Sequence, residues 1–213
     1  MRPGSPNIRW ISAICVASTS LFLASNTTYA RSAATVRTAA VMCGTCHGIR
    51  GEGAPAGVPR LAGQNADYMA HALSMFKAGS RKSAIMQPIA ASLGDPQMRA
   101  LAVYFSQLTA SIPHVRAAWS SAQVQAGKQL AKAGAANVAS CYSCHSAHAE
   151  GAGPHFPGIV GQPAQFVIER IHEFQVRARN AAPQPGTMTA VAAMMSEDQI
   201  QAAAAYLSQP RAR

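Results

Sequence analysis

The sequence has 213 residues, a mass of 22.2 kDa, and 18 Lys and Arg against 8 Asp and Glu, which gives a formal charge of +10. Hydrophobic residues make up 49% of the chain and charged residues 12%, so it is too apolar for a disordered polyelectrolyte. Its five cysteines are too few for a disulfide-dense scaffold. These values leave a folded, basic protein of one domain or two small ones.

The first 30 residues are typical of a secretory signal peptide. Arg2 and Arg9 supply a positive start, residues 10–24 are mostly apolar, and Thr28-Tyr29-Ala30 is similar to a small-residue cleavage site. The apolar run is shorter than the roughly 20 residues of a membrane-spanning helix, and an uncleaved anchor is the alternative. We therefore expect export to the periplasm. Cleavage after residue 30 would remove Cys15 and two arginines, which lowers the formal charge from +10 to +8.

The four other cysteines lie in two pentapeptides, Cys43-Gly44-Thr45-Cys46-His47 and Cys141-Tyr142-Ser143-Cys144-His145. Cys-x-x-Cys-His is the attachment signal of c-type haem. Two thiols three positions apart can reach both vinyl groups of one porphyrin edge, and the adjacent imidazole can then bind the iron. The sequence therefore predicts two covalently attached haem c groups, bound by Cys43, Cys46, Cys141 and Cys144, with His47 and His145 as iron ligands.

Four cysteines have other uses, which the spacing disfavours. Two disulfides are one alternative, and a zinc ribbon is another. Ribbon knuckles normally lie roughly 15 to 20 residues apart, whereas these two motifs are 98 residues apart. Thioredoxin-like redox pairs lie between a strand and a helix and need no His after the second Cys. Haem attachment explains the repeated His best.

The second motif belongs to an internal repeat. Residues 43–64 match residues 141–162 at nine of 22 positions, and residues 86–107 match residues 188–209 at another nine of 22. A four-residue insertion near residues 180–186 reconciles the two offsets. We predict two homologous haem domains, residues 31–110 and 122–213, joined by a linker over residues 111–121.

The predicted fold class is all-α, because alternating strand patterns are scarce. Apolar spacing predicts helices over residues 66–78 and 163–177. A closing helix should begin in each domain, at Asp95-Pro96 with Asp95 as N-cap, and at the capping box that runs from Ser196 to Gln199. Each closing helix should pack on the helix that precedes its haem motif, and Gly127 would permit a close approach in the second domain.

The second axial iron ligand separates electron transfer from catalysis. The candidates are His or Met residues after each haem motif: Met69, His71, Met75, Met86, Met98 and His114 in the first domain, and His148, His155, His172, Met188, Met194 and Met195 in the second. Only Met86 and Met188 coincide in the repeat, each in an expected loop about ten residues before a closing helix. The sequence therefore predicts His/Met ligation.

His/Met ligation carries a mechanism. A thioether ligand raises the reduction potential, and a six-coordinate iron has no open position for oxygen or peroxide. Pro59 and Pro157 each lie twelve residues after the haem His, where the proline carbonyl could accept the Nδ1 proton and orient the imidazole. The predicted sites therefore exchange electrons without making or breaking substrate bonds.

These motifs resemble those of the dihaem cytochrome c4 family. The resemblance rests on the two haem motifs, on the segment from Pro59 to Gln64 with its counterpart from Pro157 to Gln162, and on the segments that begin at Met86 and Met188. It implies two tandem class I cytochrome c domains, each wrapped around its haem, placed back to back with the propionates near the interface. It also implies electron transfer toward terminal oxidases. The second half differs beside its Met, where Thr187 replaces Ile85.

We expect a protein that passes single electrons between a respiratory donor and a terminal oxidase or reductase, and not an enzyme. One alternative is a dihaem electron-transfer subunit of a periplasmic dehydrogenase, for instance one that oxidises sulfur compounds or alcohols. Another is a dihaem peroxidase, which would need one open axial position. A basic surface favours an acidic redox protein or an anionic membrane surface as partner. Nucleic acid is excluded because the chain is predicted to be exported and its Lys and Arg are scattered.

Overall fold

The computed structural model describes residues 35–109, 119–146 and 151–209. The predicted signal peptide and most of the predicted linker lie outside these residues, as do His114 and His148. The chain divides into two units, Met1–Ala39 and Ala40–Arg213. Residues 35–39 are the described part of the first unit, and residues 40–47 of the second unit are also helical. No helix among the described residues is long and apolar enough to cross a membrane.

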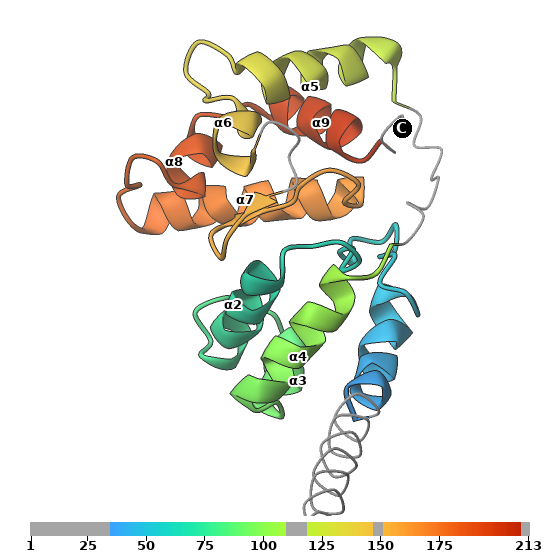
Figure 1. Ribbon diagram of the computed structural model, residues 1–213. Coiled ribbons are helices and arrows are strands. Elements are labelled where there is room, and N and C mark those ends of the chain that lie inside the picture. The colour runs from blue at the N-terminus through green and yellow to red at the C-terminus, as the bar shows by residue number, and fades with distance from the viewer. Residues whose placement is uncertain (1–34, 110–118, 147–150, 210–213) are drawn as a thin grey trace, which may run out of the picture. The chain divides into compact units, whose positions relative to one another are not determined.

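Three helices follow the first haem motif: α2 (Ala66–Lys77), α3 (Met86–Ala91) and α4 (Asp95–Ser106). The side chain of Asn65 starts α2 by accepting a hydrogen bond of 3.0 Å from the N–H of Tyr68. α2 packs against both α3 and α4 (Figure 1). Their shared apolar core consists of Met69, Ala72, Phe76, Ala90, Leu93, Met98, Leu101, Ala102 and Phe105.

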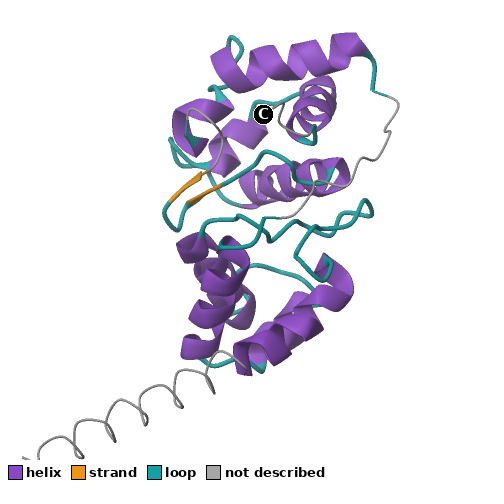
Figure 2. Ribbon diagram, turned by 45° about the vertical axis from the view of Figure 1, so that its right-hand side comes forward, coloured by secondary structure: helices purple, strands orange, loops and turns teal. Residues whose placement is uncertain are grey.

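Five helices form the second half: α5 (Ser121–Ala133), α6 (Cys141–His145), α7 (Ala164–Asn180), α8 (Met188–Ala193) and α9 (Glu197–Leu207). Two strands of two residues, β1 (Gly151–Ala152) and β2 (Phe156–Pro157), pair antiparallel between α6 and α7 (Figure 2). α5 packs on α9, and α7 packs on α8 and α9. Leu130, Val167, Ile171, Ile200 and Leu207 are the larger aliphatic members of the core.

The all-α prediction is confirmed, with the short β1–β2 pair as an addition. The helix predicted over residues 66–78 matches α2, and the one predicted over 163–177 matches α7, which continues three residues further. The capping box of α9 is confirmed, because Ser196 and Gln199 exchange hydrogen bonds between side chain and backbone. Close packing at Gly127 is also confirmed, since an added Cβ there would overlap the carbonyl oxygen of Ala202 in α9.

Two local predictions are wrong. Asp95 is the first residue of α4 and not its N-cap, because Gly94 takes that position and its N–H donates to the Gln97 side chain at 2.9 Å. Pro96 and Asp95 then both lie within the first turn. Met86 and Met188 do not lie in loops, because each is the first residue of a six-residue helix.

Candidate haem-binding sites

The two Cys-x-x-Cys-His motifs have the same pattern of burial. Cys43 and Cys141 are half-buried, and Cys46 and Cys144 are exposed. Burial raises the pKa of the Cys43 and Cys141 thiols, and the backbone N–H of each Cys lowers it by less. A reactive redox pair needs a lowered thiol pKa, so the thioredoxin-like alternative loses support. No cluster of three or more His, Cys, Asp or Glu side chains that could hold a metal ion lies within the described ranges.

Each haem-motif His is buried and held by a proline carbonyl. His47 is 8% exposed and His145 is 5% exposed. The Nδ1–H of His47 donates to the oxygen of Pro59 at 2.8 Å, and that of His145 donates to the oxygen of Pro157 at 2.7 Å, which confirms the expected pairs. These bonds fix the tautomer that leaves Nε2 to bind a metal.

Burial also favours the neutral form of both imidazoles. It lowers the pKa of His47 and of His145, and the hydrogen bonds to the proline carbonyls offset this only in part. A metal ligand must be unprotonated at the binding nitrogen, so this environment favours ligation. Within the described part of the chain, Nε2 of neither ring has a hydrogen-bond partner.

Met86 and Met188 occupy equivalent positions. Each is half-buried at the first position of its helix, α3 or α8. The N–H of Met86 donates to the hydroxyl of Ser83 at 3.1 Å, whereas Thr187 caps α8 by accepting from the N–H of Ala190 at 3.4 Å. The two helices therefore begin with different polar contacts, as the sequence difference around Thr187 indicated.

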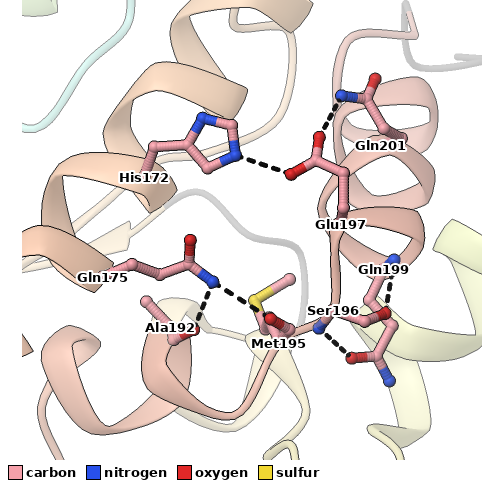
Figure 3. A network of polar contacts seen from close by, with 8 residues as sticks. All are labelled: His172, Gln175, Ala192, Met195, Ser196, Glu197, Gln199 and Gln201. Carbon is pink, nitrogen blue, oxygen red and sulfur yellow. Dashed lines mark hydrogen bonds and ion pairs between the residues drawn. The ribbon is translucent and has the colours of Figure 1, made fainter.

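One long side chain in each half ties the Met helix to the preceding helix. Gln175 of α7 donates to the carbonyls of Ala192 and Met195, each at 3.1 Å, at the end of α8 (Figure 3). In the first half, Lys77 of α2 donates to the carbonyl of Leu93 at 2.7 Å, just after α3. Lys77 and Gln175 occupy equivalent positions in the repeat. The alignment could have drawn attention to this position, but it does not predict the contact.

The methionines outside these two helix starts are less suited to bind iron. Met69, Met98 and Met195 are buried in the apolar cores, and Met194 is 52% exposed. Among the histidines, His172 pairs with Glu197 at 2.8 Å, and the rings of His71 and His155 make an edge contact at 5.2 Å. These side chains already have protein partners.

Arg81 and Arg170 lie near each other, and Arg170 also forms an ion pair with Glu173. Arg81 is 7% exposed, stacks on Phe76 at 4.5 Å and contacts the hydroxyl of Tyr68 at 3.3 Å. The pKa of Arg170 is lowered to about 10, by burial first and then by the positive charge of Arg81. Close cations in a low-dielectric setting attract anionic groups strongly. The residues present therefore fit a covalently attached haem, because each motif supplies two thiols and a buried imidazole whose Nδ1–H is held by a proline carbonyl.

Two comparisons bear directly on the family. The cytochrome c family model matches residues 33–109 and again residues 124–210. The chain is 38% identical over 174 residues to the thiosulfate dehydrogenase electron acceptor of Stutzerimonas stutzeri (strain A1501). The alignment covers 80% of this chain and 79% of that protein. The chain belongs to the cytochrome c family, as a dihaem, cytochrome c4-like member. Each of its two domains carries one covalently attached haem c, and the protein transfers electrons.

Solved structures support the same assignment of the dihaem cytochrome. Reduced recombinant cytochrome c4 from Pseudomonas stutzeri superposes with a TM-score of 0.72 and 28% identity, over 83% of this chain and 97% of that one. Thiosulfate dehydrogenase from Marichromatium purpuratum superposes with a TM-score of 0.70 and 30% identity, over 79% of this chain and 36% of that chain. The predicted tandem cytochrome c fold is thereby confirmed.

Proposed function

We propose that the two irons are each held by one His and one Met: His47 with Met86, and His145 with Met188. The thiols of the two motifs bind the porphyrins on this proposal. The observation that carries it is the pair of Nδ1–H bonds to Pro59 and Pro157, which hold both imidazoles with Nε2 available. The equivalent positions of Met86 and Met188 at the starts of α3 and α8 support the second ligand.

This ligand set makes the protein an electron carrier. Haem iron, when bound, supplies a one-electron couple. The imidazoles of His47 and His145 are held in orientation, because the carbonyls of Pro59 and Pro157 accept their Nδ1 protons. The thioethers of Met86 and Met188 would complete the ligation of the two irons and would leave no position for a substrate that reacts at the metal. Electrons therefore enter and leave without bond rearrangement in the protein.

We further propose the direction of electron flow and the compartment. The donor is a periplasmic dehydrogenase that oxidises a sulfur compound such as thiosulfate, and the acceptor is a terminal oxidase. The Stutzerimonas relative is a thiosulfate dehydrogenase electron acceptor and the similar Marichromatium structure is a thiosulfate dehydrogenase, and both support this donor. Residues 1–30 would direct export, and the formal charge of +10 would favour acidic partners or anionic lipid surfaces.

Replacing Met86 or Met188 by Ala tests the ligand assignment. Each variant should lose the Met-to-ferric-iron charge-transfer band of one haem, lower the potential of that haem and allow CO to bind its ferrous iron. Met194→Ala, at a methionine that is 52% exposed, is the control and should leave spectrum and potentials unchanged. If Met86→Ala and Met188→Ala both retain the parent spectrum, the ligand assignment is wrong.

The donor proposal has its own test. The oxidised protein should be reduced rapidly when thiosulfate and a catalytic amount of thiosulfate dehydrogenase are added together, as followed by the ferrous haem absorption band. Thiosulfate alone is the control. Reduction that is no faster with the enzyme than without it would exclude this donor while leaving the ligand assignment intact.

A further inference from the structure

Two buried glutamines connect the halves of the molecule reciprocally. Gln64 and Gln162 are equivalent in the repeat and are 7% and 6% exposed. The Gln64 side chain accepts from the N–H of Gly158 at 2.8 Å and donates to the carbonyl of Gly158 at 2.8 Å. Gln162 accepts from the N–H of Arg60 at 2.9 Å and donates to the carbonyl of Arg60 at 3.1 Å. Each side-chain amide therefore makes two hydrogen bonds to the backbone of the other half, and Gln64 also accepts from the N–H of Asn65 in its own half at 2.9 Å.

The backbone groups that these glutamines bind adjoin the haem ligands. Arg60 directly follows Pro59, and Gly158 directly follows Pro157. The N–H of Arg60 and the carbonyl of Pro59 belong to one planar peptide unit, so a bond that fixes one fixes the other. That carbonyl accepts the Nδ1–H of His47. One amide plane thus lies between the Gln162 side chain and the His47 imidazole.

The second site has the same arrangement. Gln64 binds the N–H of Gly158, the preceding carbonyl of Pro157 accepts from His145, and the distances are 2.8 and 2.7 Å. Hydrogen bonds in such a chain polarise one another, so a peptide whose N–H donates becomes a better acceptor at its carbonyl. A stronger acceptor at Nδ1–H raises the basicity of the imidazole as a metal ligand. A more basic ligand favours ferric iron.

We propose that Gln64 and Gln162 are positioning residues that act across the two halves, each setting the reduction potential of the haem held by the other half. Gln162 acts on the site of His47, and Gln64 acts on the site of His145. The inference rests on the proposed role of these His residues as iron ligands. Each haem then reaches its final reduction potential only when the two halves are in contact.

The experiment replaces each glutamine by methionine in the full holoprotein. Methionine has a similar length but makes neither of the two hydrogen bonds by which each glutamine contacts the other half. Gln123→Met in α5 is the control, because Gln123 pairs only with Ser120 of its own helix start. Spectroelectrochemical titration gives the two potentials, and hyperfine-shifted NMR signals, assigned with Met86→Ala and Met188→Ala, tell the haems apart.

Gln162→Met should shift the potential of the His47 haem upward and leave the other unchanged, and Gln64→Met should do the reverse. The proposal would be overturned if the potentials of both haems shifted equally, if only the potential of the haem in the same half as the substitution shifted, or if neither potential shifted. Gln162→Glu keeps an oxygen that can accept from the Arg60 N–H, so it should not raise the potential of the His47 haem. A rise in that variant would also overturn it. If Gln162→Met does not fold, Gln64→Met tests the proposal by itself through the potential of the His145 haem.

The two proposals fail in different ways. If Met86→Ala and Met188→Ala leave the spectra unchanged, the axial ligand assignment fails whatever the glutamine variants do. If those variants behave as expected and the glutamine variants do not shift the opposite haem, only the action across the halves is wrong.

Discussion

At the scale of single residues, Gly127 decides how closely α5 approaches α9. An added Cβ would overlap the carbonyl oxygen of Ala202 and approach Cβ of Tyr206 at 2.8 Å. Gly127→Ala should therefore lower the free energy of unfolding by about 1–3 kcal/mol, as overpacking of a core does. Urea unfolding of the holoprotein measures this. Gln125→Ala, on an exposed position of α5, is the control. An unchanged free energy of unfolding in Gly127→Ala would mean that α5 and α9 can move apart at little cost in stability.

Single residues also show where sequence reasoning succeeds and where it stops. The bonds from His47 to Pro59 and from His145 to Pro157 could be predicted, because a fixed spacing of twelve residues recurs in both halves. The partners of Gln64 and Gln162 could not, because they lie 94 and 102 residues away in the chain and meet only after folding. The repeat shows that glutamine occupies the equivalent positions 64 and 162, but it does not show that these side chains bind the other half.

At the scale of elements, α9 is tied to α7 through Glu197. Gln201 and His172 donate hydrogen bonds to its carboxylate at 2.6 and 2.8 Å (Figure 3). These bonds, with desolvation opposing them weakly, lower the pKa of Glu197. A lowered folded-state pKa means that the stabilisation is present above the ordinary carboxyl pKa of about 4.3 and is lost as the pH falls through the folded-state value.

Glu197→Gln should therefore reduce stability at pH 6 and leave it nearly unchanged at pH 3. Thermal unfolding at both pH values measures the difference. Asp198→Asn is the matched control, because it removes a charge from the same helical turn, whereas within the described residues Glu197 makes the contact to His172 of α7. Equal losses at pH 3 and pH 6 for Glu197→Gln would show that the carboxylate form has no special role.

The helix boundaries show why local pattern falls short at this scale. Apolar spacing predicted α2 and α7 because each is long and has one buried face. α3 and α8 have only six residues each, which is too few to give a periodic signal. The sequence therefore predicts loops at Met86 and Met188. Tertiary contacts stabilise these short helices, among them the bonds from Lys77 and Gln175 to carbonyls at their ends.

At the scale of the whole molecule, the sequence repeat predicts two similar domains. It does not predict the hydrogen bonds that join the two halves. Nine identities in each aligned stretch sufficed to predict two similar domains, and both match the cytochrome c family model. The contacts between halves are not encoded by periodicity or composition. The reciprocal bonds of Gln64 and Gln162 use repeat-related residues, so duplication of one domain supplied both partners of the interface.

The apolar cores of both halves are small, so we expect the fold to depend on haem. The second core contains several alanines such as Ala131, Ala192 and Ala204. Domains of this size are marginally stable by protein packing alone, whereas a porphyrin adds a large apolar surface.

Replacing all four motif cysteines, Cys43, Cys46, Cys141 and Cys144, by Ala should prevent covalent attachment and leave a largely unfolded chain. Far-UV circular dichroism of the haem-free variant should show a loss of most helical signal, and urea should produce no cooperative transition. Replacing only Cys141 and Cys144 should remove the helical signal of one half and retain the haem spectrum of the other. Native helix content in the haem-free four-cysteine variant would show that the protein core alone suffices, and that haem serves only electron transfer.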